Sequence, residues 1–216
     1  MEPLLEFEAE ARSEGYRRVA GVDEVGRGPL AGPVVACAVI LPANESVLEG
    51  LTDSKQLCAA RRKELAGQLQ LLPGITIGAG VVSPADIDRL NILRATHQAM
   101  LHALGELDPP ADYILVDGRP VPGLPAPSRA IVKGDALSAS IAAASILAKV
   151  IRDAMMVDFE ETYPGYGFAA HKGYGTAEHL AALERLGPCP IHRVSFAPVQ
   201  RCLPGALRQG TLDLGA

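Results

Sequence analysis

The sequence predicts an α/β fold in which helices flank a mixed five-stranded sheet. Two apolar segments, residues 16–24 and 32–42, lie so close in the chain that they can pair as antiparallel neighbours. Beyond them, segments with helical spacing alternate with short apolar segments, as in domains that pack helices against a sheet. The chain has 216 residues, enough for one sizeable core.

Composition narrows the class of protein. Hydrophobic residues make up 48% of the chain and charged residues 21%, which is typical of a globular protein. No apolar run approaches the ~18 residues of a membrane helix, and the acidic start is not typical of a signal peptide. The four cysteines are scattered without a CxxC pair, which favours reduced thiols, a cytoplasmic location and no structural zinc site.

The first half of the chain contains two more predicted helices and a third strand. Leucines at helical spacing predict a helix over 58–72, which ends before Pro73. The alternating segment 75–82 is the third strand. Residues 83–104 have the pattern of one long amphipathic helix that begins at the N-cap Ser83.

The second half continues the alternation and completes the sheet. Residues 112–118 are the fourth strand, and 129–135 are a shorter fifth strand after a proline-rich loop. Residues 136–163 form a long helix whose first part is small or apolar on all sides, as expected of a buried helix. A further short helix covers 176–187 and ends at a glycine.

The pattern predicts a single domain over residues 1–200. Within it, residues from about 164 to 200 form a helical and loop extension that follows the long helix. We expect residues 201–216 to be a flexible tail.

Three of the predicted strands end in acidic residues: Asp23 with Glu24, Asp117, and Asp135. In open α/β sheets, functional groups gather beyond the carboxyl ends of the strands. If these strands are neighbours, four carboxylates converge, and two like charges ~4 Å apart repel by ~4 kcal/mol at an effective dielectric constant of ~20. The alternative is that each acid caps a strand or loop independently. That alternative is less favoured for four acids at strand ends than for a single one.

Divalent cations would neutralise such a cluster. All candidate ligands are hard oxygens, which indicates Mg²⁺ or Mn²⁺ and not zinc. Two such ions can activate a water and stabilise the leaving oxygen in phosphodiester cleavage. The net charge of −5 gives no sign of a nucleic-acid partner. However, acids that hold cations lower the formal charge, so this value does not describe the charge of the protein surface.

Six segments, spread over residues from about 17 to 200, resemble the bacterial ribonuclease HII family. In order, they are "GVDEVGRGPLAGPVVACAVIL", "TDSK", "VDG", "IVKGDALSASIAAASILAKVIRD", "YPGYGFAAHKGYGT" and "GPCPIHRVSFAP". The resemblance implies a ribonuclease H-like fold and hydrolysis of the RNA strand of RNA–DNA hybrids. It also implies cleavage of duplex DNA on the 5′ side of a single ribonucleotide, with 5′-phosphate and 3′-hydroxyl products, in ribonucleotide removal and primer RNA degradation.

The resemblance also implies roles for the acids. Asp23, Glu24 and Asp117 would bind two divalent cations, Mn²⁺ or Mg²⁺, and Asp135 would complete the catalytic set. Asp153 belongs to the family pattern as well, and we expect it to lie behind the ligands or to stabilise its helix.

Gly26, Arg27 and Gly28 match the loop with which the family reads the RNA–DNA junction. Because glycine lacks a Cβ, backbone groups there can approach a ribose and bond its 2′-hydroxyl, and Arg27 can bind a phosphate. A site built to bond a hydroxyl can reject the analogue without it by ~10⁴–10⁵. Tyr174 matches the tyrosine that packs against the next sugar, although composition alone makes it a packing residue.

Four cations are candidates for phosphate contacts, which supply affinity and not sequence information: Lys55, Lys133, Lys172 and Arg193. The alternative for each is a solvated surface charge. We expect His171 and His192 to be hydrogen-bonded structural residues. In "LTDSK" the chain departs from the family, which commonly has Asn before the Asp.

The predicted partners are RNA–DNA hybrids and ribonucleotide-containing duplex DNA, bound by a monomer without a protein or membrane partner. One alternative is a protein that binds hybrids without cutting them, which would need a broken acid set. Another is a DNA-cutting nuclease or integrase relative on the same fold. The glycine loop and Tyr174 argue against the second alternative, because a DNA-only enzyme needs no reader of 2′-hydroxyls.

Overall fold

A five-stranded mixed sheet forms the centre of the protein, as predicted. The computed structural model describes residues 5–42, 51, 54 and 57–203. The strand order is β3-β2-β1-β4-β5, in which β1 pairs antiparallel with β2 and parallel with β4. The strands are β1 (Val19–Val25), β2 (Val34–Ile40), β3 (Thr76–Val82), β4 (Tyr113–Asp117) and β5 (Ser128–Ile131).

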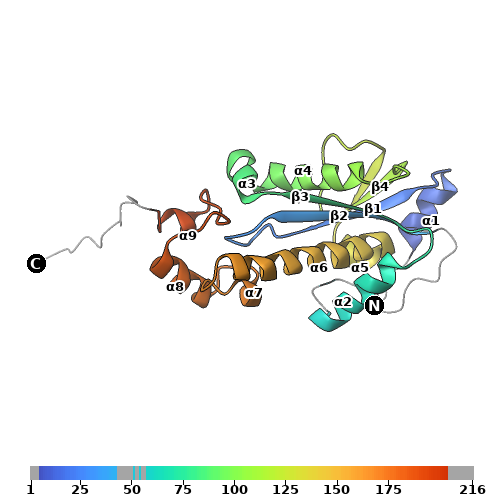
Figure 1. Ribbon diagram of the computed structural model, residues 1–216. Coiled ribbons are helices and arrows are strands. Elements are labelled where there is room, and N and C mark those ends of the chain that lie inside the picture. The colour runs from blue at the N-terminus through green and yellow to red at the C-terminus, as the bar shows by residue number, and fades with distance from the viewer. Residues whose placement is uncertain (1–4, 43–50, 52–53, 55–56, 204–216) are drawn as a thin grey trace, which may run out of the picture.

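Helices cover both faces of this sheet (Figure 1). One face packs against α4, and the other packs against α6, with α2 outside α6. The helices in the described part of the chain are α1 (Glu6–Ser13), α2 (Ala59–Gln70), α3 (Pro84–Leu90), α4 (Ile92–Gly105), α5 (Gly134–Leu137), α6 (Ala139–Thr162), α7 (Phe168–His171), α8 (Ala177–Leu186) and α9 (Ala197–Gln200). Within the same ranges, none combines the length and hydrophobicity that a membrane span requires.

Strand β2 shows how the two cores are built. Its side chains alternate between the faces, so that Ala36 and Ala38 join the core under α4 while Cys37 and Val39 join the core under α6. All seven residues of the strand are buried. A continuous apolar segment therefore became a strand covered on both sides.

The predicted single helix over 83–104 is wrong, because the chain forms α3 and α4 instead. Asn91 separates them with a φ of 70°, and its side chain accepts hydrogen bonds from the backbone N–H groups of Leu93 and Arg94 at 3.0 and 3.1 Å. Asparagine tolerates positive φ and is a strong N-cap, so it ends one helix and begins the next. The amphipathic spacing continues across the break, which is why the sequence suggested one helix.

The prediction that Asp135 ends a strand is also wrong. Strand β5 ends at Ile131, and Asp135 lies in the first turn of the short helix α5. The predicted helix over 136–163 is divided at Ser138, which has extended φ and ψ values of −124° and 128° and caps α6 through its side chain. A hydroxyl N-cap inside a run of small residues thus separates α5 from α6.

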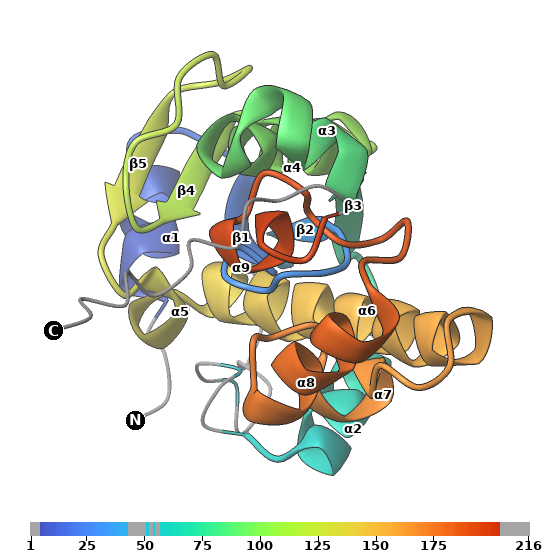
Figure 2. The same ribbon diagram turned by 90° about the vertical axis from the view of Figure 1, so that its left-hand side faces the viewer.

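The C-terminal extension folds back onto the loop after β1. Helix α7 packs against α6, α8 lies next to α7, and α9 lies near the ends of β1 and β2 (Figures 1 and 2). The backbone N–H of Leu30 donates to Gly173, and that of Arg193 donates to Leu30. The helices α1, α7 and α9 were not predicted, and the expected tail falls mostly outside the described residues, which end at 203.

Candidate active site

Strands β1 and β4 bring two of the predicted acids to one edge of the sheet. These parallel strands pair as far as Val22 with Val116, so Asp23 and Asp117 are the next residues of each strand. Asp23 lies opposite Cys37 on the α6 side and forms a hydrogen bond with Ser145 of α6. The side chain of Asp23 is consequently buried, with 5% of the residue exposed.

Glu24 points to the other side of the sheet, because neighbouring strand residues face opposite ways. It lines a cleft of about 670 Å³ beside α4, together with Asp117, Arg27, His97 and Arg119. Asp117 interacts electrostatically with both Asp23 and Glu24. The three carboxylates therefore form one group although they belong to two strands and two faces.

Asp135 joins this group through a backbone contact. The N–H of Gly134 donates a 2.7 Å hydrogen bond to Asp117, which ties the start of α5 to the end of β4. Asp135 follows directly and is buried, with 6% exposed. The fold thus places Asp135 next to the residue that contacts Asp117, on a helix in place of the strand that the sequence suggested.

The negative charges of these carboxylates repel one another. Burial raises the pKa of Asp23 well above its ordinary value, and the neighbouring carboxylates of Glu24 and Asp117 raise it further. Burial also raises the pKa of Glu24, while the Arg27 guanidinium, 3.2 Å away, acts in the opposite direction. A bound cation would relieve this repulsion.

The donor set fits a hard divalent cation, since it consists of carboxylate oxygens. In the described residues, however, no three acidic, histidine or cysteine side chains are already arranged to hold an ion. Glu24 is held in an ion pair with Arg27, whose guanidinium lies 3.2 Å from its carboxylate, so a cation bound at Glu24 would compete with that guanidinium.

Two buried arginines hold the backbone between Gly26 and Pro33, which includes the glycine loop. Arg193 is fully buried and donates hydrogen bonds to the carbonyl groups of Gly26 and Arg27, at 2.5 and 3.0 Å. Arg152 of α6, also fully buried, donates to the carbonyl groups of Ala31 and Pro33. The structure contradicts the expectation that Arg193 contacts phosphate, because its guanidinium is used inside the protein.

Gly26 has a structural need for glycine. Its φ is 96°, and a Cβ on it would lie 2.3 Å from Nε of Arg152. A side chain at this position would push the arginine out of the loop. The sequence contained no signal for the two arginines, whose partners are far away along the chain.

Tyr174 lies against the same loop. A Cβ on Gly28 would be 3.7 Å from the Tyr174 ring, and 43% of the tyrosine is exposed. Its ring is thus held beside the glycine loop and remains open to solvent. The predicted loop and the predicted aromatic residue are therefore neighbours.

The predicted lysines are less closely grouped. Lys55 lies outside the described residues. Lys133 is exposed next to the acid-bearing helix α5, with a φ of 60°. Lys172 lies at a second pocket, of about 280 Å³, between α2 and α6, where its ammonium donates to the carbonyl of Ala169.

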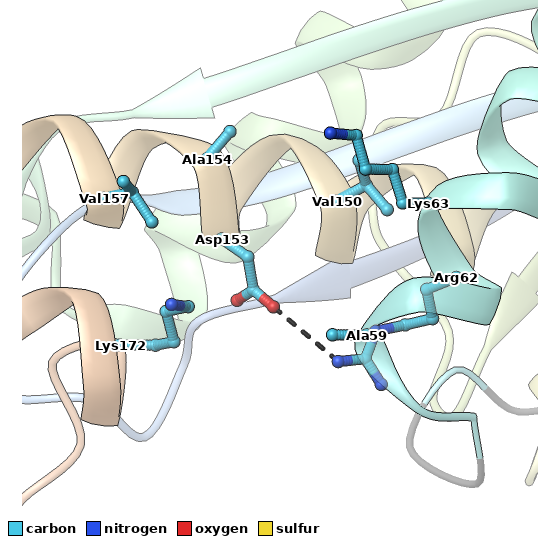
Figure 3. Close-up of a pocket in the computed structure, with 8 residues that line it drawn as sticks. All are labelled: Ala59, Arg62, Lys63, Val150, Asp153, Ala154, Val157 and Lys172. Carbon is cyan, nitrogen blue, oxygen red and sulfur yellow. Dashed lines mark ion pairs between the residues drawn. The ribbon is translucent and has the colours of Figure 1, made fainter.

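Asp153 faces this second pocket and not the acid group (Figure 3). It accepts a 2.6 Å hydrogen bond from Lys149 and lies 3.9 Å from Arg62, which in turn donates to the carbonyl of Ser54. Asp153 thus links α6 to α2 and the residues before it. The expectation that Asp153 stabilises its helix stays a prediction, supported by the ion pair with Lys149 four residues earlier in α6.

His97 and Arg119 were not predicted as site residues. Both line the cleft beside Glu24 and Asp117. Burial, followed by the charge of Arg27, lowers the pKa of His97. Arg119 directly follows the segment "VDG", which is the one sequence feature that could have identified it.

This architecture is the ribonuclease H-like fold. The crystal structure of ribonuclease H2 from Pyrococcus horikoshii OT3 matches 86% of this chain and 97% of its own, with a TM-score of 0.73 at 27% identity. The PCNA:RNase HII complex from Archaeoglobus fulgidus contains a match to 90% of this chain and 98% of the other chain, with a TM-score of 0.71 at 26% identity.

The sequence comparisons are more specific. A family model described as Ribonuclease HII matches residues 20–199. A ribonuclease HII from Rhodospirillum rubrum is 59% identical over 189 residues, which cover 86% of this chain and 87% of that protein. The chain belongs to the ribonuclease HII family, as its motifs predicted, and is a metal-dependent endonuclease with ribonuclease H activity on RNA–DNA hybrids.

Proposed function

We propose that this enzyme cuts the RNA strand of hybrids and also cuts duplex DNA on the 5′ side of a single ribonucleotide. The observation that carries the proposal is the joining of two sites: Asp23 and Glu24 end the strand that leads directly into the loop beside Tyr174. Cleavage would give 5′-phosphate and 3′-hydroxyl ends. Such an activity serves ribonucleotide removal and the degradation of primer RNA.

Asp23, Glu24 and Asp117 would hold two divalent cations, Mg²⁺ or Mn²⁺, and Asp135 would complete the catalytic group. When bound, the cations supply an activated water and stabilise the leaving oxygen. Burial makes the negative charge on Asp23 costly without a cation, so the pocket favours cation binding over an isolated carboxylate. Asp117 is oriented by the Gly134 N–H before any ion arrives.

Recognition of the ribonucleotide would take place at the glycine loop. Arg193 bonds the carbonyl groups of Gly26 and Arg27, which leaves the loop rigid and its other backbone groups available for a 2′-hydroxyl. Arg27 is half-exposed and could exchange its ion pair with Glu24 for a phosphate. The ring of Tyr174 would pack against the following sugar and disfavour a second 2′-hydroxyl. Lys55, Lys133 and Lys172 remain proposed phosphate contacts.

The test is cleavage of a labelled DNA duplex that contains one ribonucleotide, with Mg²⁺, with Mn²⁺ and with a chelator. We expect one cut on the 5′ side of the ribonucleotide, dependent on metal, and no cut in an all-DNA duplex. Binding without cleavage under every metal condition would overturn the proposed cut at a single ribonucleotide. Cleavage of the all-DNA duplex would favour another nuclease on the same fold.

We expect Tyr174→Ala to reduce cleavage of the single-ribonucleotide duplex by about tenfold or more, and cleavage of a long hybrid by much less. The ring should matter most where one sugar must be distinguished from the next. Relative rates on the two substrates measure this. Tyr174→Phe is the matched control, because it keeps the ring and should retain the selectivity. Equal losses on both substrates would show that Tyr174 is structural.

We further propose that the enzyme acts in the cytoplasm. The same assay, combined with gel filtration, tests the proposal that it acts as a monomer and without a protein partner. The Archaeoglobus fulgidus ribonuclease HII was solved in complex with PCNA, so a protein partner of that kind is the alternative. Full cleavage by a purified chain that elutes from gel filtration as a monomer would support independent action. A requirement for a second protein would contradict it.

A further inference from the structure

A buried histidine pair lies behind Tyr174 and is not used in the proposed chemistry. His179 of α8 and His192 are 0% and 2% exposed, and their Nε2 atoms are 3.1 Å apart. Nδ1 of His179 lies 2.8 Å from the carbonyl oxygen of Tyr174. The backbone N–H of Cys189 lies 3.0 Å from Nδ1 of His192. These contacts form a continuous chain from Cys189 to Tyr174.

The direction of each hydrogen bond follows from its ends. The Cys189 N–H can only donate, so Nδ1 of His192 accepts and its proton is on Nε2. His192 then donates to Nε2 of His179, whose own proton must be on Nδ1. That proton is donated to the Tyr174 carbonyl, which can only accept. The Cys189 carbonyl, at 3.3 Å from the same Nδ1 of His192, is the longer contact.

We propose that the neutral His179–His192 pair positions Tyr174 against the glycine loop and so sets the preference for single ribonucleotides. The inference rests on the proposed function of Tyr174 as the residue that packs against the sugar. One arrangement of ring protons satisfies every bond in the chain. An additional proton on either ring breaks a bond. On Nε2 of His179 it would face the proton of His192, and on Nδ1 of His192 it would face the Cys189 N–H.

The surroundings of the pair favour the neutral state. His171 of α7 stacks on His179 with ring centroids 4.4 Å apart, and the rings of Tyr166 and Phe168 pack against His192. The thiol of Cys189 lies 3.1 Å from Nδ1 of His192. Two carboxylates of the described residues lie in this region. The exposed Glu178 interacts electrostatically with His171, and Glu160 accepts hydrogen bonds from the backbone N–H groups of Gly165 and Ala169. A positive charge on the pair would thus face another histidine and apolar rings.

Burial, and then the neighbouring His179, lowers the pKa of His192 to about 4. Burial also lowers the pKa of His179. Both rings are therefore neutral at neutral pH, and the chain of hydrogen bonds is complete there. The contribution of the neutral rings to folding stability decreases as pH falls below about 6.5, the ordinary value for histidine, because the unfolded chain then takes up protons. In the folded enzyme the chain of hydrogen bonds persists to lower pH and is lost as pH approaches about 4, where His192 takes up a proton.

Two variants of one residue separate the positioning role from simple packing. His179→Leu removes the hydrogen bond to Tyr174, and His179→Asn places an amide N–H near the position of Nδ1 and keeps it. The readout is the ratio of cleavage rates on the single-ribonucleotide duplex and the long hybrid, in which any common effect on the acids cancels. We expect His179→Leu to lower this ratio about fivefold and His179→Asn to retain it within about twofold.

The Tyr174→Ala variant separates the positioning role of the histidine pair from the proposed role of Tyr174 in reading the sugar. If Tyr174→Ala lowers the ratio and a folded His179→Leu does not, the positioning role is overturned and the proposed function stands. If Tyr174→Ala itself leaves the ratio unchanged, the proposed role of Tyr174 in reading the sugar is overturned, and the positioning inference that rests on it is overturned as well. In the double variant, His179→Leu should have no further effect on the ratio, because its target is gone.

Nitrogen NMR of the unaltered enzyme gives a test that needs no activity and no variant. The imidazole signals should show His179 protonated at Nδ1 and His192 protonated at Nε2 at pH 7. The opposite tautomers, or a charged ring at that pH, would overturn the inference even if His179→Leu did not fold. The selectivity ratio of the unaltered enzyme should also decrease as pH is lowered toward about 4, where His192 takes up a proton. Wild-type selectivity of a folded His179→Leu would contradict the proposal.

Discussion

Asp117→Asn should abolish cleavage, with a loss of about 10³-fold or more, while hybrid binding changes by less than about threefold. The substitution removes one negative charge from the group that would neutralise the cations and barely changes its shape. The asparagine oxygen can still accept the 2.7 Å hydrogen bond from the Gly134 N–H, so the junction of β4 and α5 should persist. Single-turnover cleavage and hybrid binding without metal measure the two effects separately.

Asp158→Asn is the matched control for this variant. Asp158 lies on the exposed side of α6, outside the acid group, and should keep wild-type activity after the same chemical change. Near-normal cleavage by Asp117→Asn would remove Asp117 from the proposed metal ligands. Loss of both binding and thermal stability would instead show that Asp117 mainly supports the fold.

Gly21→Ala should destabilise the enzyme by about 3 kcal/mol or more and lower its melting temperature by about 6–12 °C. Gly21 lies in β1 where α6 crosses, and a Cβ there would be 2.2 Å from both the backbone nitrogen of Ile141 and the backbone carbon of Ser140. These are backbone atoms of the first turn of α6, which cannot move aside like a flexible side chain. Strand and helix must separate to admit one methyl group.

Thermal unfolding followed by circular dichroism measures this loss. Activity should also fall below the melting temperature, because Asp23 is two residues from Gly21 and Ser145 of α6 contacts it. Gly67→Ala is the control: it lies within α2 and a Cβ there meets nothing within 4 Å, so stability should stay constant or rise by up to about 1 kcal/mol. A melting temperature of Gly21→Ala equal to that of the unaltered enzyme would contradict the close-contact argument.

The order of strands and helices was predictable because each depends on short-range patterns. Strand β2 was visible as an apolar segment and α8 as a periodic one with a terminal glycine. The breaks at Asn91 and Ser138 were not predicted, because each capping residue interrupts a helix while the hydrophobic spacing continues across the break. The short helix α9 has too few turns to show any periodicity.

The candidate site was predicted only in part for a related reason. Acids at the ends of strands can be identified along the chain, and the parallel pairing of β1 with β4 confirms that Asp23 and Asp117 become neighbours. Asp135 comes near Asp117 by another route, because the preceding Gly134 at the start of α5 donates to the Asp117 carboxylate. The sequence contained no sign that Arg193 would serve the interior, because an arginine has the same local appearance whether it is solvated or buried.

By itself, the sequence determined the class of the fold, the acid group, the glycine loop and the family, because periodicity and motif spacing are local properties. The tertiary structure alone decided that Arg193 reaches Gly32 across 161 residues of chain and that two buried histidines connect Cys189 to Tyr174. Hydrogen-bond partners and the protonation of buried rings depend on which distant groups meet in the folded core. These long-range contacts follow from tertiary packing, and no local sequence pattern predicts them.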